Sequence, residues 1–361
     1  MNPRGFPHPI LPPFILSAIA RNGSPQERDS ALRTLSLDST LRSARAADFC
    51  LTPHLRQLGA TTGQKRRTIC DARGTQQLPG QPVRQEGDGP SKDVAVNEAY
   101  EGLGATYDFF SSVYGRNSID DKGLALLATV HFGKQYNNAF WNGDQMVFGD
   151  GDGRLFNRFT LSLDVIGHEL THGVTQSEAN LDYFMQPGAL NESVSDVFGS
   201  LVKQYRLGQT AEQADWLIGE GLFTPKVKGV ALRSMKAPGT AFDDPVLGKD
   251  PQPADMKGYV DTLSDNGGVH INSGIPNRAF YLAAVGIGGF AWEKAGRIWY
   301  ETLRDKRLAN NANFSQFAAL TVENAAKLYG AHSPEEKAVL EGWQVVGVVW
   351  AAGKPGAAAS A

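Results

Sequence analysis

His168, Glu169 and His172 stand in the order His-Glu-x-x-His near the middle of the 361-residue chain. On a helix, residues four apart lie one turn apart on the same face, so the two imidazoles can bind one Zn²⁺. The carboxylate between them cannot easily bind the same ion, but it can reach a water on the metal and accept its proton. This spacing predicts a zinc hydrolase. The alternative is a surface helix that carries two histidines by chance.

The residues around this motif predict a buried helix. Apolar residues recur there at helical spacing and leave the histidines on a different face: Leu163, Ile166, Leu170 and Val174. Gly167 and Gly173 would each weaken a helix, so we expect another part of the chain to approach the helix closely at these positions.

A catalytic zinc usually has three protein ligands, and Glu192, twenty residues after His172, is the candidate for the third. It lies in a second stretch of helical periodicity, and Pro187 with Gly188 is expected to form the turn before that helix. Asp196 follows Glu192 by one turn and could accept the second ring proton of a ligand histidine. The alternative is that both acids are solvated side chains of a surface helix.

Further blocks occur in order around the zinc motif. They read YNNAFW at 136–141, MVFGDGDG at 146–153, LRSM at 232–235 and DNGGVHINSG at 265–274. With these blocks the chain resembles the thermolysin family of metallopeptidases from about residue 94 to about residue 349. The N-terminal segment PPFIL at 12–16 is similar to the protealysin-type branch of that family, whose precursors carry a short propeptide.

The resemblance implies a neutral zinc endopeptidase with one catalytic Zn²⁺. Glu169 would be the general base that takes a proton from the zinc-activated water and passes it to the leaving amine. Tyr183 and His270 would stabilise the oxyanion that forms when water attacks a peptide carbonyl. Asp265 would orient or protonate the imidazole of His270.

The resemblance also assigns the substrate contacts. Arg233 would donate to a substrate carbonyl, while Asn138 and the backbone of Ala139 would pair with the substrate as an added strand. An apolar pocket for the side chain after the scissile bond would be lined by Phe156, Val165 and Leu232. We therefore expect cleavage before bulky hydrophobic residues.

Two other functions are compatible with the zinc motif. A zinc aminopeptidase shares it, but needs an acidic anchor for the free amine of its substrate, and activity on amine-blocked peptides would separate the two enzymes. A non-catalytic, zinc-stabilised protein-binding module would close the fourth metal position and would need no general base.

Calcium binding is doubtful. Asp164, Asp215 and Glu220 resemble calcium ligands of the family, but Lys203 and Leu217 stand where two further acids are expected. A full calcium site needs six to eight oxygen ligands, and a lysine ammonium repels the ion. The sequence therefore predicts that a double calcium site is absent.

Composition limits the class of protein. The chain is 41% hydrophobic with a formal net charge of −3, which supports a sizeable core and gives no electrostatic case for a nucleic-acid partner. It has no apolar run of the roughly 18 to 20 residues that span a membrane. Peptide and protein substrates are the expected partners, and we expect a monomer.

The N-terminus lacks the pattern of a conventional signal peptide. The resemblance implies export by another route, and a cytoplasmic role stays open. Cys50 and Cys70 are interpreted as free thiols, the alternatives being one disulfide or a cysteine that blocks the zinc in a latent form.

The predicted organisation is an α+β, thermolysin-like fold of two lobes with the zinc helix between them. A propeptide would act as an intramolecular inhibitor, and a connecting segment would be processed. A strand-rich N-terminal peptidase lobe would end in the zinc helix, followed by an all-helical C-terminal lobe and a flexible tail. The expected ranges are 1–50 for the propeptide, 51–92 for the connecting segment, 93–176 for the N-terminal lobe, 177–350 for the C-terminal lobe and 351–361 for the tail. Helices are expected at 14–21, 26–45, 279–285, 291–303, 314–329 and 334–345.

Overall fold

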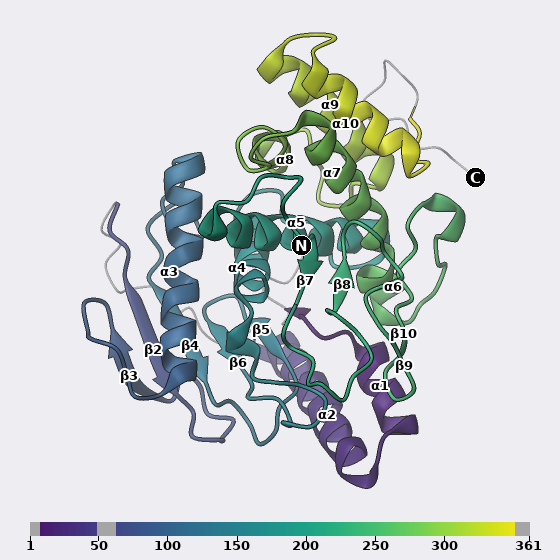
Figure 1. The fold of residues 1–361 in the computed structure, drawn as a ribbon. Helices are drawn as coiled ribbons and strands as arrows, with labels where there is room; N and C mark the ends of the chain where they lie inside the picture. The colour runs from purple at the N-terminus through teal and green to yellow at the C-terminus, as the bar shows by residue number, and fades with distance from the viewer. Residues whose placement is uncertain (1–7, 49–62, 351–361) are drawn as a thin grey trace.

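The computed structural model describes residues 8–48 and 63–350 (Figure 1). Three sequence features lie outside these ranges, namely Cys50, the stretch 49–62 at the predicted propeptide junction, and the tail at 351–361.

The N-terminal part is built on a six-stranded mixed sheet in the order β1-β5-β6-β4-β2-β3. β2 pairs in parallel with β4, and β4 with β6, while the other neighbours are antiparallel. The strands are β1 (His8–Pro9), β2 (Arg67–Asp71), β3 (Gln81–Gln85), β4 (Leu126–Val130), β5 (Ala139–Trp141) and β6 (Met146–Phe148). The predicted strand-rich N-terminal lobe is confirmed.

Helix α3 (Val94–Tyr114) packs against this sheet (Figure 1). Asp93 caps its start by accepting hydrogen bonds from the backbone N–H groups of Ala95 and Val96. The helix ends where Gly115 takes the left-handed conformation, with φ of 68°.

Helices α4 (Leu163–Ser177) and α5 (Met185–Leu207) pack closely against each other at the centre of the molecule. A Cβ added at Gly199 of α5 would lie 2.4 Å from the carbonyl oxygen of Asp164 in α4, so only glycine permits this approach. The expected close contacts at the two glycines of α4 are also present. A Cβ added at Gly167 would lie 3.1 Å from the Cα of Gly199, and one added at Gly173 would lie 2.5 Å from the Ile119 side chain.

The prediction that Pro187 and Gly188 form the turn before α5 is wrong. The helix begins at Met185, and both residues lie in its first turn. A proline is tolerated there because the first N–H groups of a helix have no partner within the helix.

The C-terminal part is helical as predicted, but it is not all-helical, because four short strands also occur in it. Its helices are α6 (Asp265–Asn272), α7 (Gly274–Ile287), α8 (Ala295–Arg304), α9 (Phe314–Tyr329) and α10 (Pro334–Val345). The predicted bounds of α9 and α10 are confirmed, whereas α8 begins four residues later than expected because 291–294 form a turn. Two small antiparallel sheets join β7 (Leu217–Ile218) to β8 (Arg233–Ser234) and β9 (Asp243–Asp244) to β10 (Gly248–Lys249).

The first described segment packs onto the peptidase lobes. Helices α1 (Pro13–Asn22) and α2 (Pro25–Asp48) lie together on the side of the molecule opposite α8 to α10 (Figure 1). Before them, β1 adds a strand to the sheet beside β5, with His8 opposite Trp141 and Pro9 opposite Phe140.

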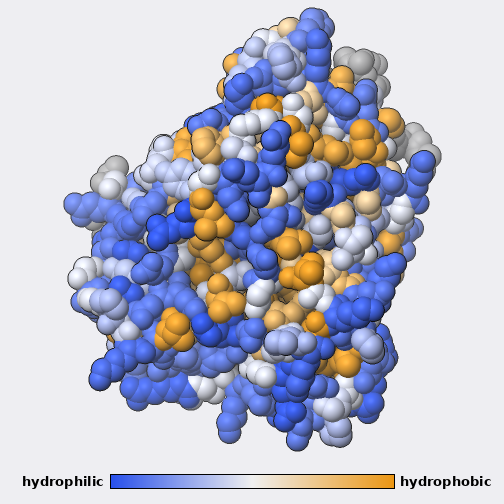
Figure 2. All heavy atoms as spheres, in the orientation of Figure 1, coloured by the Kyte–Doolittle hydropathy of each residue, from blue (hydrophilic) through white to orange (hydrophobic). Residues whose placement is uncertain are grey.

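The surface carries mostly polar side chains on the face shown in Figure 2. The apolar residues on that face lie in separate groups. Within the described ranges, each helix is too short or too polar to cross a bilayer.

Candidate metal centre and substrate cleft

Three predicted ligands converge between α4 and α5. The Nε2 atoms of His168 and His172 lie 3.0 Å apart, and each is 3.5 Å from a carboxylate oxygen of Glu192. All three side chains are buried, and their candidate ligand atoms lie within 4.8 Å of one another. Among the described residues, this is the one cluster of three or more His, Cys, Asp or Glu side chains that could hold a metal, and Cys70 is not part of it.

The contacts of the other ring nitrogens show that this site suits a cation. His168 Nδ1 lies 2.8 Å from Asp196 Oδ1, and His172 Nδ1 lies 2.8 Å from Asn191 Oδ1. Because both partners accept hydrogen bonds, the rings are protonated at Nδ1 and their Nε2 lone pairs face each other. Two lone pairs at that separation repel unless a positive ion lies between them. These ligands and their geometry fit Zn²⁺.

The sequence-predicted Asp196 lies behind the metal centre in an ionic network. Arg233 donates to both of its carboxylate oxygens at 2.8 Å, and the amide of Asn277 donates to Oδ2 at 2.8 Å. Burial opposes ionisation, but Arg233 and His168 hold the pKa of Asp196 well below its usual range. Asn191 and Asn277 were not predicted. Asn191 lies in the same helical turn as Glu192, which is the one local signal, whereas Asn277 has none.

Glu169 is completely buried and faces the end of β5. Its Oε2 accepts a hydrogen bond of 2.8 Å from the backbone N–H of Trp141, while its Oε1 has no partner within the described part of the chain. Burial raises the pKa of this carboxyl well above its usual range, the nearby Glu192 adding to the shift.

Tyr183, His270 and Asp265 lie on the other side of the metal ligands. The Tyr183 hydroxyl donates to Glu192 and lies 3.2 Å from Nε2 of His270. Asp265 contacts His270 twice, at 2.6 Å from Nδ1 and 2.9 Å from the backbone nitrogen. Burial opposes protonation of His270, but Asp265 and Glu192 outweigh it and raise the pKa to about 9.

A left-handed turn brings Asp265 back to His270. Four consecutive residues, from Asp265 to Gly268, have φ between 51° and 82°. A Cβ at Gly267 would lie 2.9 Å from the backbone nitrogen of Met185, so this turn packs directly against the start of α5. The sequence predicted the pairing of Asp265 with His270 but not this break in the helix.

The substrate-binding residues that the sequence predicted contact the chain's own N-terminal segment. Ile10 N–H donates to the carbonyl of Ala139 at 3.1 Å, and Leu11 N–H donates to Asn138 Oδ1 at 2.9 Å. The amide of Asn138 returns a bond to the carbonyl of Leu11 at 3.2 Å. Arg233 donates to the carbonyl of Ile10 at 3.2 Å.

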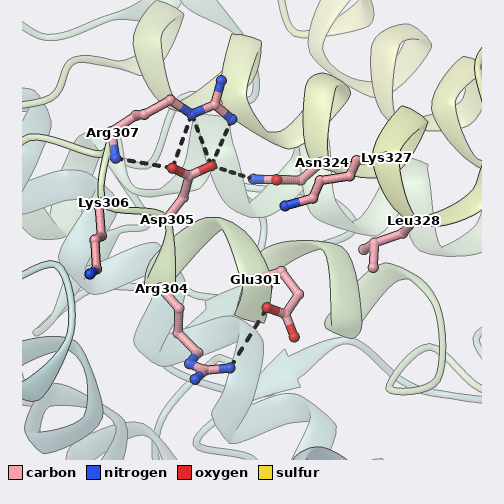
Figure 3. Close-up of a pocket in the computed structure, with 8 residues that line it drawn as sticks. All are labelled: Glu301, Arg304, Asp305, Lys306, Arg307, Asn324, Lys327 and Leu328. Atoms are coloured by element: carbon pink, nitrogen blue, oxygen red, sulfur yellow. Dashed lines mark hydrogen bonds and ion pairs between the residues drawn. The ribbon is translucent and has the colours of Figure 1, made fainter.

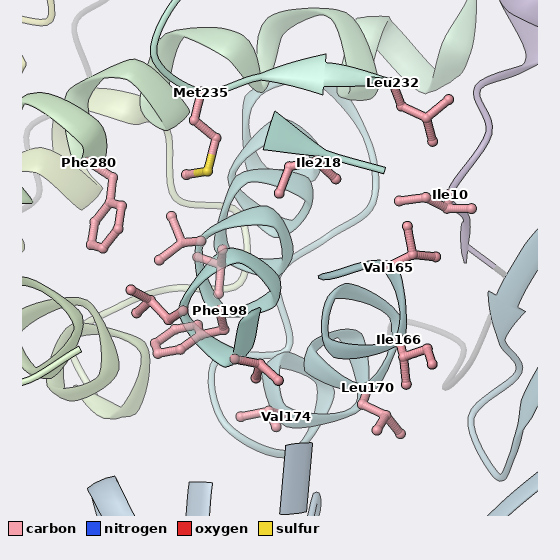
Figure 4. Close-up of a cluster of buried hydrophobic side chains, with 14 of the residues drawn as sticks. Ile10, Val165, Ile166, Leu170, Val174, Phe198, Ile218, Leu232, Met235 and Phe280 are labelled. Carbon is pink, nitrogen blue, oxygen red and sulfur yellow. The ribbon is translucent and has the colours of Figure 1, made fainter. Parts of the chain in front are cut away.

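The side chain of Ile10 is buried among apolar side chains of the peptidase lobes. It is fully buried and points toward Val165 and Leu232, which come from α4 and from the chain before β8 (Figure 4). Phe156, the third predicted pocket residue, is buried in the same hydrophobic cluster, where its ring packs against Phe159 and Phe223.

The acids that resemble calcium ligands surround a lysine. The ammonium of Lys203 lies 2.7 Å from Asp215, 3.2 Å from Glu220 and 3.4 Å from Asp164. Leu217 contributes only a backbone N–H at this point, which donates to Asp215. The positive charge among these acids therefore comes from the chain itself.

A separate charged hollow lies between α8 and α9 (Figure 3). Arg307 and Asn324 both bind Asp305 there, and Arg304 lies 3.7 Å from Glu301. None of the predicted site residues lines this hollow, so it is not part of the metal centre.

Comparison with known proteins places this site in a family. Residues 47–176 match the family model of the thermolysin metallopeptidase catalytic domain, and residues 179–348 match that of the thermolysin metallopeptidase alpha-helical domain. The chain is 56% identical over 340 residues to an extracellular metalloprotease of Pectobacterium carotovorum subsp. carotovorum, covering 94% of this chain and 96% of that protein. It is 51% identical over 347 residues to protease PrtS of Photorhabdus sp. (strain Az29), covering 94% and 91%.

A solved structure agrees with these relatives. The precursor of protealysin, a metalloproteinase from Serratia proteamaculans, superposes with a TM-score of 0.87 at 56% identity, covering 95% of this chain and all of that one. The Pectobacterium and Serratia relatives are named as a metalloprotease and a metalloproteinase, which gives no support to an aminopeptidase or a non-catalytic binding module. The chain therefore belongs to the thermolysin family of zinc metallopeptidases, with a protealysin-type relative.

Proposed function

We propose that this protein is a neutral zinc endopeptidase made as a zymogen, which cleaves peptide bonds before bulky hydrophobic residues. The observation that carries the proposal is the backbone of Ile10, which lies directly after β1, the strand that pairs antiparallel with β5, and donates its N–H to the carbonyl of Ala139. Chain continues on both sides of this residue, so the cleft accepts the middle of a peptide and needs no free terminus.

The proposed reaction begins with the positioning of the substrate. Asn138, Ala139 and Arg233 hold the backbone of the bound chain, leaving the bond before the pocket residue next to Glu169. Bound Zn²⁺, held by His168, His172 and Glu192, supplies a Lewis acid that lowers the pKa of a water and polarises the carbonyl.

Glu169 then moves the proton. Its Oε1, which has no partner among the described residues, accepts a proton from the attacking water and gives it to the leaving amine. Tyr183 and the imidazolium of His270 donate hydrogen bonds to the oxyanion, and Asp265 keeps that imidazole protonated and oriented.

The side-chain preference follows from the apolar side chains around Ile10. Val165 and Leu232 present apolar surface to it, and Phe156 belongs to the same buried cluster. A branched aliphatic or aromatic side chain gains roughly 1.5–3 kcal/mol from such burial, whereas a charged one loses its hydration.

The zymogen proposal assigns residues 1–50 to an inhibitory propeptide and 51–92 to the connecting segment in which the chain would be cut, with β2 and β3 of that segment staying paired with the sheet of the first lobe. Residues 93–176 and 177–350 would be the two peptidase lobes, followed by the tail at 351–361. The propeptide occupies the positions that a substrate needs, so hydrolysis requires its removal. We further propose that the active enzyme is a monomer and that it is secreted, as the relative from Pectobacterium is named extracellular.

The test follows the intact mass of purified wild type and Glu169→Ala over time at neutral pH with zinc present. The wild type is expected to lose an N-terminal segment of about fifty residues and then to cleave an amine-blocked peptide before leucine or phenylalanine. Glu169→Ala should retain one zinc per chain and lose at least about 100-fold in hydrolysis, since a general base contributes about that much or more.

Survival of peptide hydrolysis in zinc-loaded Glu169→Ala, after its propeptide has been cut off by another protease, would contradict the proposed mechanism. Cleavage of free-amine peptides alone would contradict the endopeptidase assignment.

A further inference from the structure

Three buried polar residues on α2 face the substrate-binding loop at one-turn spacing. Ser30, Thr34 and Asp38 are 1%, 1% and 4% exposed, although all three side chains are polar. Residues four apart share one face of a helix, so these three form a continuous stripe, called here the polar ladder. Burying polar side chains costs free energy unless each is hydrogen-bonded, so the partners of the ladder decide its role.

The partners within the described part of the chain lie in residues 135–138, directly before β5. Thr34 Oγ1 accepts from the backbone N–H of Asn137 at 3.1 Å. Ser30 Oγ accepts from the amide of Asn137 at 3.0 Å and donates to the carbonyl of Gln135 at 3.1 Å.

Asp38 completes the ladder at the cleft. One of its carboxylate oxygens accepts from the Tyr136 hydroxyl, and the other accepts from the amide of Asn138 at 3.1 Å. Since Asn138 donates to Asp38 and to the carbonyl of Leu11, its Oδ1 is turned toward the N–H of Leu11. The helix thus orients a residue that the bound strand also uses.

The hydrogen bonds between the polar ladder and residues 135–138 depend on which face α2 turns toward them. Turning α2 by one residue would rotate the ladder by about 100° and place apolar or exposed side chains against these donors. Leu37 and Leu41 pack beside the ladder on Phe132, Tyr136 and Phe140, which adds buried area but carries no comparable directional requirement.

We propose that residues 135–138 form a helix-docking surface, which adjoins the strand-binding cleft at Asn138. Its partner is the propeptide helix, which binds it through Ser30, Thr34 and Asp38. This inference rests on the proposed zymogen function and deepens it. It implies that the propeptide remains bound as a separate folded chain after the connection to the peptidase lobes is cut.

The experiment uses the full-length Glu169→Ala chain with a recognition sequence for a site-specific protease inserted between residues 51 and 62. After cleavage by that protease, native mass spectrometry and dilution measure how much propeptide remains bound. The chain with an intact ladder should retain its propeptide. Thr34→Val and Asp38→Ala should each weaken binding by about tenfold or more, since each removes an acceptor to which a buried donor of the peptidase lobe is bound.

Two matched controls lie on the same helix. Thr40→Val and Ser39→Ala change exposed side chains and should leave binding unchanged. A further variant changes the peptidase side. Tyr136→Phe removes the hydrogen bond to Asp38 but keeps the packing of the ring, so it should also weaken propeptide binding. It provides a test if Asp38→Ala does not fold.

Immediate loss of the propeptide from the cut chain with an intact ladder would overturn the proposal, and so would unchanged binding in Thr34→Val and Tyr136→Phe. None of these measurements needs peptide hydrolysis. A failure of the proposed peptidase activity would therefore appear only in the assay of wild type, and would be distinguishable from failure of the docking surface.

Discussion

At the scale of single residues, each zinc-binding imidazole is held through the nitrogen that faces away from the metal. His168 is oriented by a carboxylate, and His172 by the amide oxygen of Asn191. The Asn191 amide nitrogen in turn donates to the carbonyl of Leu181 at 3.2 Å, which fixes which end of the amide faces the ring.

Replacing Asn191 with leucine should therefore weaken zinc binding. His172 would lose the acceptor that keeps its proton on Nδ1, and outer contacts of this kind are worth about 10- to 100-fold in metal affinity. Competition with a chelator at neutral pH measures the change. Unaltered zinc affinity in a folded Asn191→Leu chain would mean that Ser195, 3.1 Å from the same nitrogen, is a sufficient partner.

His131 leads to a second prediction, on pH. It lies between Asp150 and Asp93, 2.9 Å from each, and hydrogen bonding to Asp150 together with both negative charges raises its pKa from 6.5 to about 9 despite burial. Because the folded pKa is the higher one, the contribution to stability is complete below about pH 6.5 and is lost as pH rises through about 9.

His131→Gln should thus lower the free energy of unfolding by about 1 to 2 kcal/mol at pH 6 and by much less at pH 10, allowing for solvent screening of a side chain that is 23% exposed. Urea unfolding of the Glu169→Ala chain at both pH values measures this free energy, and His332→Gln, at an exposed histidine, is the control. An equal loss at both pH values would show that charge is not the cause.

At the scale of elements, α4 and α5 carry most of the site between them. A shift between these two helices would separate the zinc ligands, because each helix contributes part of the set. The residues that project from α4 are His168, Glu169 and His172, and those that project from α5 are Asn191, Glu192 and Asp196. Lys203 near the end of α5 joins this pair to the following loop through its ion pairs with Asp164, Asp215 and Glu220.

Lys203→Met should destabilise the protein by about 3 kcal/mol or more, because it leaves the buried carboxylate of Asp164 without its cation. Thermal or urea unfolding of the inactive chain gives the value, and the exposed Lys236→Met serves as the matched control. If both variants lose the same stability, the ion pairs around Lys203 contribute nothing specific.

At the scale of the whole molecule, the groups proposed for catalysis and substrate binding come from both parts of the chain. Glu169 and Asn138 belong to the first matched domain, and Tyr183, Arg233 and His270 to the second. The close contact at Gly199 holds the two together, since its Cα hydrogen faces the backbone of the zinc helix where any side chain would meet Asp164 and His168.

Gly199→Ala should therefore disturb the metal site as well as the fold. The added methyl would force α4 and α5 apart, costing about 1–3 kcal/mol of unfolding free energy and lowering zinc affinity together. Gly286→Ala, where the nearest atom is the Ala338 side chain at 3.2 Å, should leave zinc affinity unchanged. Normal zinc binding in a destabilised Gly199→Ala chain would separate the two effects and contradict this account.

Much of this protein could be predicted from local sequence. The two zinc-binding histidines lie within one turn of each other, and α9 and α10 begin at the capping residues Asn313 and Ser333, whose side chains accept from backbone N–H groups three residues later. The roles of Tyr183, Arg233 and His270 came from motif resemblance, because no local rule links residues so far apart in the chain.

Tertiary structure alone decided the contacts between distant segments. Asn277 reaches Asp196 across 81 positions, Ile10 reaches Arg233 across 223, and Asp38 reaches Asn138 across 100. The left-handed turn at 265–268 depends likewise on packing against Met185. Periodicity and spacing report only which face of an element is buried. Which partner covers that face depends on how the elements pack, and in this chain that packing places the N-terminal segment in the cleft beside the metal centre.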